Sequence, residues 1–300
     1  MLTKLDHDVY NDSVASFMLS ENVRGRFARV NQSLNHILAQ HKYPEKVSRL
    51  MAEAILLTVM IGQAIKLKWK LSVQIRGSGS IRLIAVDYFS PNDEFSSANI
   101  RAYAKFDFDA VENAVEPGFH LLGKGLFAVL IDQGEGTKPY QGLTPLAGES
   151  LADCAETYFD QSEQLPNIKV LEQFNKSTIS NPKLKKNNLK QINNCDFENW
   201  SRANILMNTI EELELVGPQL APIDILKRLF HQEALRVFEP QKLIFGCSCS
   251  IEKVSRTLSI YSLKDIKSMM TNEGTVTADC QFCSKHYVLD PNKLGFESEG

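Results

Sequence analysis

Four of the six cysteines in the 300-residue chain form two short pairs near its C-terminal end. Cys247 and Cys249 make a Cys-x-Cys pair, and after thirty intervening residues Cys280 and Cys283 make a Cys-x-x-Cys pair. Two close pairs of thiolates suit tetrahedral zinc, because the intervening segment can fold back and bring the second pair to the first. The spacing therefore predicts one zinc ion per chain, bound by these four cysteines in the reduced state.

The same cysteines fit two other kinds of site. An inert structural zinc ribbon uses the same ligands, and an unligated Cys-x-x-Cys pair is typical of thiol–disulfide oxidoreductases. The second kind is disfavoured because no thioredoxin-like βαβ pattern surrounds Cys280. We expect His286, three residues beyond Cys283, on an exposed strand rather than on the metal. Cys154 reads as a buried apolar residue of a helix, and Cys195 has no partner in the sequence.

The composition of the chain indicates which binding partners and which cellular compartment are expected. The net charge of −3 gives no general basic field for phosphates, so a nucleic-acid partner is not expected, and the lysines of residues 183–190 read as a solvated face. The N-terminal residues lack a secretory signal, which together with the cysteines favours a reducing, cytoplasmic location. The apolar stretch 50–67 is too short and too polar to span a membrane. No catalytic triad or carboxylate pair stands out, and we expect no enzyme.

The cysteine pairs need a scaffold, and the pattern of the chain predicts an α+β fold. Helical spacing marks residues 12–40, 44–67 and 150–164. Strand patterns mark residues 72–76 and 81–85, joined through the turn glycines Gly77 and Gly79. Further strands are expected at 100–106, 126–132 and 139–143. The sequence thus predicts a sheet-and-helix domain over residues 1–178.

Two further sections follow this core. Residues 179–240 read as a flexible or helical linker, with a Lys- and Asn-rich stretch at 180–194 and amphipathic helices at 196–216 and 223–237. Residues 241–294 hold the cysteine pairs in a domain too small to be stable by burial alone, so a metal would be needed to hold it together.

Several short motifs occur together with the cysteine pairs. They are Arg76-Gly77-x-Gly79, Leu122-Gly123-x-Gly125, Tyr140-Gln141-Gly142, Tyr158-Phe159-x-x-Ser162-Glu163-Gln164, and Phe245-Gly246 directly before Cys247. In this order, over nearly the whole chain, they resemble the heat-shock protein 33 family of bacterial redox-regulated holdase chaperones. The combination of the Phe-Gly and Ser-Glu-Gln elements with the two cysteine pairs is highly specific.

The resemblance implies a protein that is zinc-bound and inactive when reduced. Oxidants would convert the four thiolates to two disulfides with loss of zinc, and the loosened protein would bind unfolding proteins without ATP, often as a dimer. Because neighbouring thiols close small loops, we expect the disulfides Cys247–Cys249 and Cys280–Cys283. The apolar residues of 196–240 are the nearest candidates for the client-binding surface.

One alternative outside this class is a zinc-ribbon protein that binds nucleic acid, and another is a thiol–disulfide oxidoreductase that uses Cys280 and Cys283. The ribbon would need a basic face, but the basic and acidic residues of 250–279 balance one another. An oxidoreductase would act catalytically, whereas a holdase acts near one-to-one with its client.

Overall fold

The computed structural model of the chain describes residues 11–19, 23–93, 96–162, 194–211, 214 and 220–294. Its internal contacts divide the chain into two compact units. The first comprises residues 1–38 and 43–245, and the second comprises residues 39–42 and 246–300. The second unit therefore contains both cysteine pairs.

The first unit is built on a sheet that has nine strands in the described part of the chain. The strand order is β2-β1-β9-β5-β4-β3-β6-β7, with β8 paired to β1. Neighbouring strands are antiparallel except for the parallel pair of β5 and β9. The strands are β1 (Ser13–Leu19), β2 (Val23–Arg29), β3 (Lys70–Gly77), β4 (Ile81–Phe89), β5 (Ala98–Phe106), β6 (Gly125–Asp132), β7 (Tyr140–Pro145), β8 (Leu235–Val237) and β9 (Gln241–Phe245).

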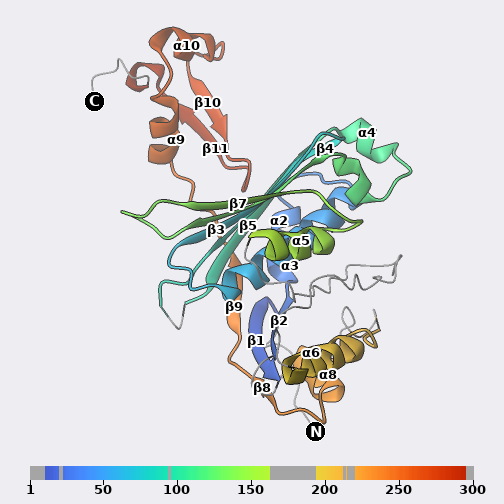
Figure 1. Cartoon of the computed structure of the whole chain (residues 1–300). Coiled ribbons are helices and arrows are strands. Elements are labelled where there is room, and N and C mark those ends of the chain that lie inside the picture. The colour runs from blue at the N-terminus through green and yellow to red at the C-terminus, as the bar shows by residue number, and fades with distance from the viewer. Residues whose placement is uncertain are drawn as a thin grey trace. The chain divides into compact units, whose positions relative to one another are not determined.

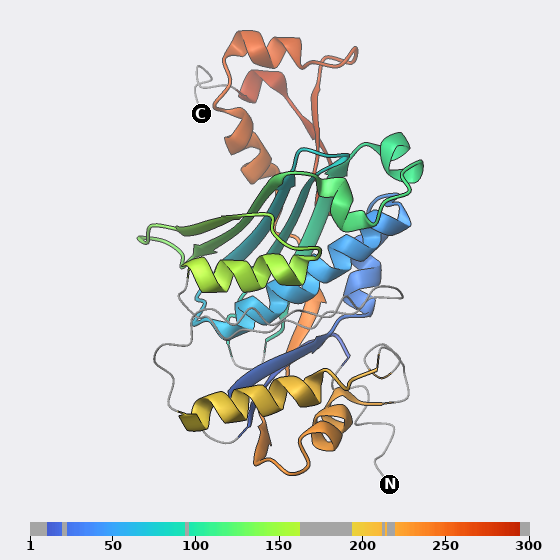
Figure 2. The same cartoon turned by 45° about the vertical axis from the view of Figure 1, so that its right-hand side comes forward.

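Helices α3 (Glu45–Ala64) and α5 (Leu151–Ser162) lie along one face of the sheet (Figures 1 and 2). Among the described helices, α3 alone is long and apolar enough to cross a membrane. Its hydropathy has another explanation, since its buried side chains, such as Met51 and Ile55, form the centre of the main core with the inward residues of β3 to β6. In the described part of this unit the remaining helices are α2 (Gln32–Leu38), α4 (Phe108–Glu112), the 3-10 helix η1 (Gly118–Leu122), α6 (Asn194–Met207) and α8 (Pro222–Leu229).

The middle of the chain follows the sequence prediction closely. The helices expected at 44–67 and 150–164 are α3 and α5, and the strands expected between 72 and 143 are β3 to β7. The β3–β4 turn needs its glycines, because a Cβ at Gly77 would lie 2.3 Å from the Leu122 carbonyl oxygen and one at Gly79 would lie 2.2 Å from that of Leu121. Both prediction and structure therefore give these glycines a role in the turn.

The single helix predicted over residues 12–40 is wrong. This segment forms the antiparallel hairpin β1–β2 and then the short helix α2. Asp12 marks the change, since its φ is 46° and its carboxylate accepts the N–H groups of Asn31, Gln32 and Ser33 at the start of α2. Side chains from distant parts of the chain then fix the hairpin, and these contacts outweigh the apolar spacing that indicated a helix.

The helices predicted at 196–216 and 223–237 are confirmed in part. Helix α6 occupies much of the predicted 196–216 helix, while the predicted 223–237 helix ends at Leu229 and its last residues form β8. The Lys- and Asn-rich stretch up to residue 193 lies outside the described residues. Apolar side chains of α6 and α8, including Ala203 and Ile225, pack with Phe17 and Val23 of the β1–β2 hairpin in a second core cluster.

The second unit is small. Its elements are α9 (Ile251–Leu258), α10 (Leu263–Ser268), the hairpin strands β10 (Val276–Asp279) and β11 (His286–Leu289), and the 3-10 helix η2 (Pro291–Lys293). Ser250 caps α9, and Ser262 forms a capping box with Asp265 at the start of α10. The buried apolar core consists of Ile266, Val276, Tyr287, Leu289 and Leu294.

A half-buried carboxyl in α3, that of Glu53, predicts a pH-dependent stability. Burial raises the pKa of Glu53 to about 7, although Arg49 acts in the opposite direction. Because this folded-state pKa lies above the unfolded value, the folded chain keeps a proton that the unfolded chain releases. The resulting stability is full below about pH 4.5 and is lost as the pH rises through about 7.

Between pH 5 and pH 8 we therefore expect the free energy of unfolding of the wild type to fall by up to about 3 kcal/mol because of Glu53. The Glu53→Gln variant should not show this decrease. Urea unfolding of the reduced protein across this range measures the difference from the wild type. Glu135→Gln, at an exposed carboxylate in a loop, is the control and should keep the wild-type slope. Parallel pH profiles for the wild type and Glu53→Gln would contradict the assignment.

Candidate metal centre

Local structure in the second unit positions both cysteine pairs. Cys247 and Cys249 occupy the segment between the end of β9 and the start of α9, where Ser250 fixes the chain by capping the helix. Cys280 directly follows β10, and Cys283 lies in the turn that leads into β11. The hairpin therefore presents the second pair at one end of its two strands.

The four sulfur atoms converge. The Sγ atoms of Cys247 and Cys280 are 3.7 Å apart, those of Cys249 and Cys283 are 3.4 Å apart, and all four lie within 4.8 Å of one another. Zn–S bonds of about 2.3 Å in a tetrahedron place neighbouring sulfurs roughly 3.8 Å apart. The sulfurs thus have the type, number and spacing that a zinc ion requires. These four thiols are free rather than joined as disulfides.

The turn that carries the second pair is held by backbone and side-chain hydrogen bonds. The Ser284 N–H donates to the Cys280 carbonyl at 2.8 Å, and the Cys280 N–H donates to the Lys285 carbonyl at 3.0 Å. Ser284 adopts the left-handed conformation with φ of 53°. Residues 39–42 of the same unit add two contacts, since the Ser284 hydroxyl donates to the Gln40 carbonyl and His41 Nε2 lies 2.7 Å from the Gln281 carbonyl oxygen.

Hydrogen bonding makes the four sulfurs unequal. The Tyr287 hydroxyl donates to Cys249 Sγ at 3.1 Å. Burial acts to raise the pKa of Cys249, but hydrogen bonds from Tyr287 and from the other three cysteines outweigh it and lower that pKa to about 7. Burial and the neighbouring cysteines raise the pKa of Cys283. Since the thiolate is the form that binds metal and reacts with oxidants, the chemistry of the cluster is compatible with both metal binding and oxidation.

Tyr287 is the site residue that the sequence analysis missed. Its hydrogen bond to Cys249 is also the main reason that its own pKa is raised. A signal was present, because Tyr287 and Leu289 alternate along the strand with the exposed residues His286 and Val288. That alternation turns Tyr287 towards the interior of the unit.

The remaining candidates lie where the sequence places them or cannot be judged. His286 is on β11, exposed and 2.7 Å from an Asp279 carboxylate oxygen, and it is not part of the sulfur cluster. Cys154 is fully buried in α5, where burial raises its pKa and its Sγ lies 3.2 Å from the Ala147 carbonyl oxygen. Cys195 belongs to α6, but its side chain lies outside the described residues.

Comparisons with known proteins agree with this geometry. The family model described as Hsp33 protein matches residues 12–290. A 33 kDa chaperonin of Caulobacter vibrioides is 33% identical over 300 residues, covering 95% of this chain and 97% of the relative. A 33 kDa chaperonin of Azotobacter vinelandii is 34% identical over 279 residues, covering 91% of this chain and 89% of the relative.

A solved structure supports the fold. The crystal structure of a 33 kDa chaperonin from Thermotoga maritima, a heat shock protein 33 homologue, aligns with a TM-score of 0.68. The alignment covers 94% of this chain and 96% of the other at 19% sequence identity. The family match over nearly the whole chain, the close relatives and the converging cysteines lead to one conclusion: the chain belongs to the Hsp33 family of chaperones.

Proposed function

We propose that this chain is a redox-regulated, ATP-independent holdase that binds unfolding proteins in the cytoplasm under oxidative stress. The observation that carries the proposal is the cluster of four free thiols in a chaperone of this family. Cys247, Cys249, Cys280 and Cys283 bind zinc in the reduced, inactive form. The active form carries the disulfides Cys247–Cys249 and Cys280–Cys283 and associates as a homodimer.

The redox step is balanced by two molecules of peroxide. Each disulfide forms when two thiolates give up two electrons, and one peroxide takes up these electrons together with two protons from the solvent and becomes two molecules of water. A disulfide sulfur is a poor zinc ligand, so each reaction removes two ligands at once. Two reactions remove all four. When bound, zinc would cross-link the two cysteine pairs. The atoms that are oxidised are the cysteine sulfurs.

Loss of these cross-links should unfold the second unit. A structural zinc ion contributes about 10–16 kcal/mol to modules of this kind. The five buried apolar residues of the unit form a core too small to replace this contribution. Residues 246–294 are therefore folded when the cysteines share a metal and unfolded when they are oxidised. In functional terms the chain divides into a core (1–178), a linker (179–240) and a switch (241–294).

The covalent connection between switch and sheet is short. Strand β9 ends at Phe245, two residues before Cys247. Its buried Leu243 donates an N–H to the Asp12 carbonyl at 2.8 Å, and Phe245 stacks on His36 with ring centroids 4.5 Å apart. β9 pairs with β1 only through Gln241 and Lys242. β9 also pairs with β5 through Leu243, Ile244 and Phe245, so unfolding that starts at residue 246 would next reach a five-residue strand with short pairings on both sides.

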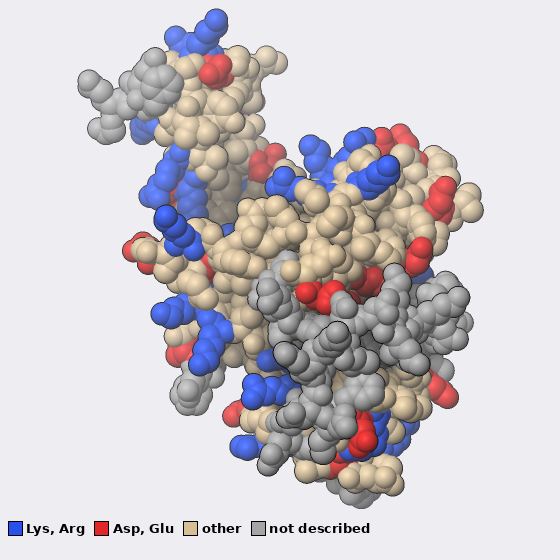
Figure 3. All heavy atoms as spheres, viewed as in Figure 1, with Lys and Arg blue, Asp and Glu red and all other residues tan. Residues whose placement is uncertain are grey.

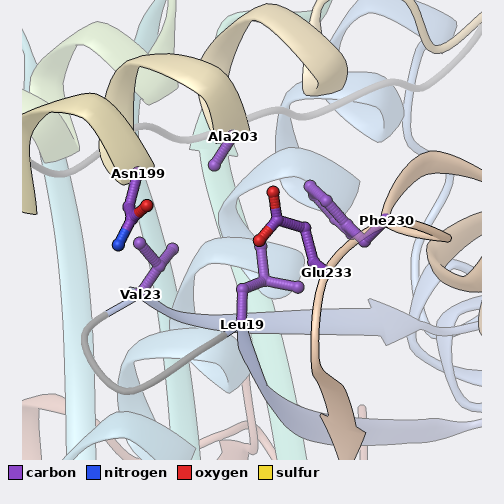
Figure 4. A pocket seen from close by; sticks show the side chains of 6 residues that line it. All are labelled: Leu19, Val23, Asn199, Ala203, Phe230 and Glu233. Atoms are coloured by element: carbon purple, nitrogen blue, oxygen red, sulfur yellow. The ribbon is translucent and has the colours of Figure 1, made fainter. Parts of the chain in front are cut away.

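The surface released in this way is apolar. Helices α6 and α8 bury Ala203, Ile225, Leu226 and Leu229 together with Phe230 against β1 and β2. Figure 4 shows Ala203 of α6 opposite Leu19, Val23 and Phe230, around a cavity of about 10 Å³. A cavity of this size holds at most one water, so the linker packs closely on the hairpin. Separation of the two would expose a contiguous apolar surface for unfolded clients.

The first test follows metal and activity together. We expect the reduced protein to contain one zinc per chain, with X-ray absorption showing four sulfur ligands at about 2.3 Å. Peroxide should release the zinc and, over the same time course, give the protein the ability to suppress aggregation of an unfolded client. Nitrogen ligation would overturn the ligand set. Client binding that is complete before any zinc is released would overturn the mechanism.

The second test concerns the disulfides. The sulfur contacts within the cluster do not select a pairing, because every sulfur lies within 4.8 Å of the other three. We expect Cys247–Cys249 and Cys280–Cys283, since neighbouring thiols close the smallest loops. The Cys-x-Cys bridge should form later, because it strains its backbone. Peptide mapping during oxidation measures both, and Cys247 joined to Cys280 would reject the pairing.

The third test separates a switch from a scaffold. Cys280→Ser removes a ligand and one disulfide, so we expect zinc affinity to fall at least tenfold and the second unit to become less stable. The variant should then bind clients partially under reducing conditions, where the wild type should bind none. Cys154→Ser, at a buried cysteine outside the cluster, is the matched control, and it and Cys195→Ser should leave oxidative activation unchanged.

The outcomes of the third test also distinguish the other classes of protein. A thiol–disulfide oxidoreductase would lose activity when Cys280 is replaced, and an inert zinc ribbon would gain no client binding. A reduced Cys280→Ser protein whose second unit is unfolded, yet which binds no client, would contradict the coupling between the cysteine cluster and the apolar surface.

A further inference from the structure

Three cations surround a hollow on the sheet of the first unit that the proposed chaperone function does not use. The hollow has a volume of about 460 Å³ and is lined by Arg76, Arg82, Leu83 and Lys105. The three charged side chains come from β3, β4 and β5, which are neighbours in the sheet. Lys and Arg side chains gather around the start of β4 near α4 in Figure 3.

Strand register explains why these side chains share one face. Arg76 pairs with Leu83, and Leu83 pairs with Lys105, so these three lie in one row across the sheet. The next residues along β3 and β4, Ile75 and Ile84, are fully buried in the core with α3. Side chains alternate along a strand. Arg76, Leu83 and Lys105 therefore lie on the face opposite the core helices.

A β-bulge adds the third cation. Along β4, Ile81 pairs with Phe106 and Leu83 pairs with Lys105, which leaves Arg82 as an extra residue between consecutive partners. Two residues of a bulged strand face one residue of the partner strand, and such bulges redirect a side chain. Regular alternation would put Arg82 on the face opposite Leu83. The bulge instead brings Arg82 into the hollow beside Lys105.

The three cations are not neutralised within the described part of the chain. The ion pairs found there do not include Arg76, Arg82 or Lys105. Arg76 instead donates to the neutral Gln74 side chain at 2.9 Å. On the same face Asp87 is already bound by Arg101, at 2.6 Å, and by the Ser72 hydroxyl. Three positive charges thus face one small hollow.

We propose that Arg76, Arg82 and Lys105 form a binding site for a short oligophosphate anion. A peptide carboxylate brings one negative charge into such a volume, whereas linked phosphoryl groups bring several. The planar guanidinium groups of Arg76 and Arg82 match two phosphate oxygens at a time, and the lysine adds a mobile point charge. The anion would come from an inorganic phosphate chain or from the phosphate chain of a nucleotide.

Calorimetric titration of the reduced, zinc-loaded, full-length protein with sodium tripolyphosphate tests the site. We expect one saturable site per chain whose affinity falls as the salt concentration rises. The double variant Arg82→Ala/Lys105→Ala should bind at least a hundredfold more weakly. Both side chains are exposed, so the variant should keep the wild-type circular dichroism and zinc content. Lys138→Ala, at an exposed lysine outside the hollow, should stay within twofold of the wild type.

Further ligands identify the source of the anion. ATP binding as tightly as tripolyphosphate supports a nucleotide source, and tripolyphosphate binding without ATP binding supports an inorganic one. Hexaglutamate as tight as tripolyphosphate would overturn the proposal in favour of an acidic peptide. Adenosine binding as tightly as ATP would show that the phosphates are not recognised. Absence of saturable tripolyphosphate binding, or equal affinity in the folded double variant, would also overturn it.

Discussion

Convergence of four sulfur atoms is the interaction on which the second unit depends. Helices α9 and α10 are eight and six residues long, too short to be stable alone. The β10–β11 hairpin has four residue pairs, and a hairpin of two strands is marginal in water. Since local structure and burial are both weak here, we expect metal ligation and folding of this unit to be coupled. Under the proposed function, a reaction at the sulfurs would therefore also change the folding of residues 246–294.

The cysteine cluster could be predicted because its information is local. A Cys-x-Cys pair and a Cys-x-x-Cys pair each hold two sulfurs close together whatever the surrounding fold, so the spacing alone names the four candidate ligands that converge in the structure. Strands β3 to β7 could be predicted for a related reason. They follow one another in sequence and mostly pair as sequential neighbours, with glycine-containing turns such as Gly77–Gly79 between them. In both cases residues close in sequence determine the structure.

The features that the sequence did not predict depend on distant residues. The β1–β2 hairpin looks helical by spacing, but β1 receives β8 and β9 from more than 200 residues away. The contacts of Gln40 and His41 with the cysteine turn join positions more than 200 residues apart. Nothing in the local pattern of either segment signals its partner. Tyr287 is intermediate, because alternation indicates that it points inward but not that it meets Cys249.

The position of β9 in the sheet links these local and distant features. β9 lies between β1 and β5, so it covers one edge of each strand. An uncovered strand edge presents N–H and C=O groups with which an extended chain can pair. The fold therefore covers two surfaces, the apolar cluster under α6 and α8 and one edge of each of the two strands β1 and β5. Residues 241–245 cover the strand edges by pairing with β1 and β5, and they connect the helices of the apolar cluster to the first cysteine pair.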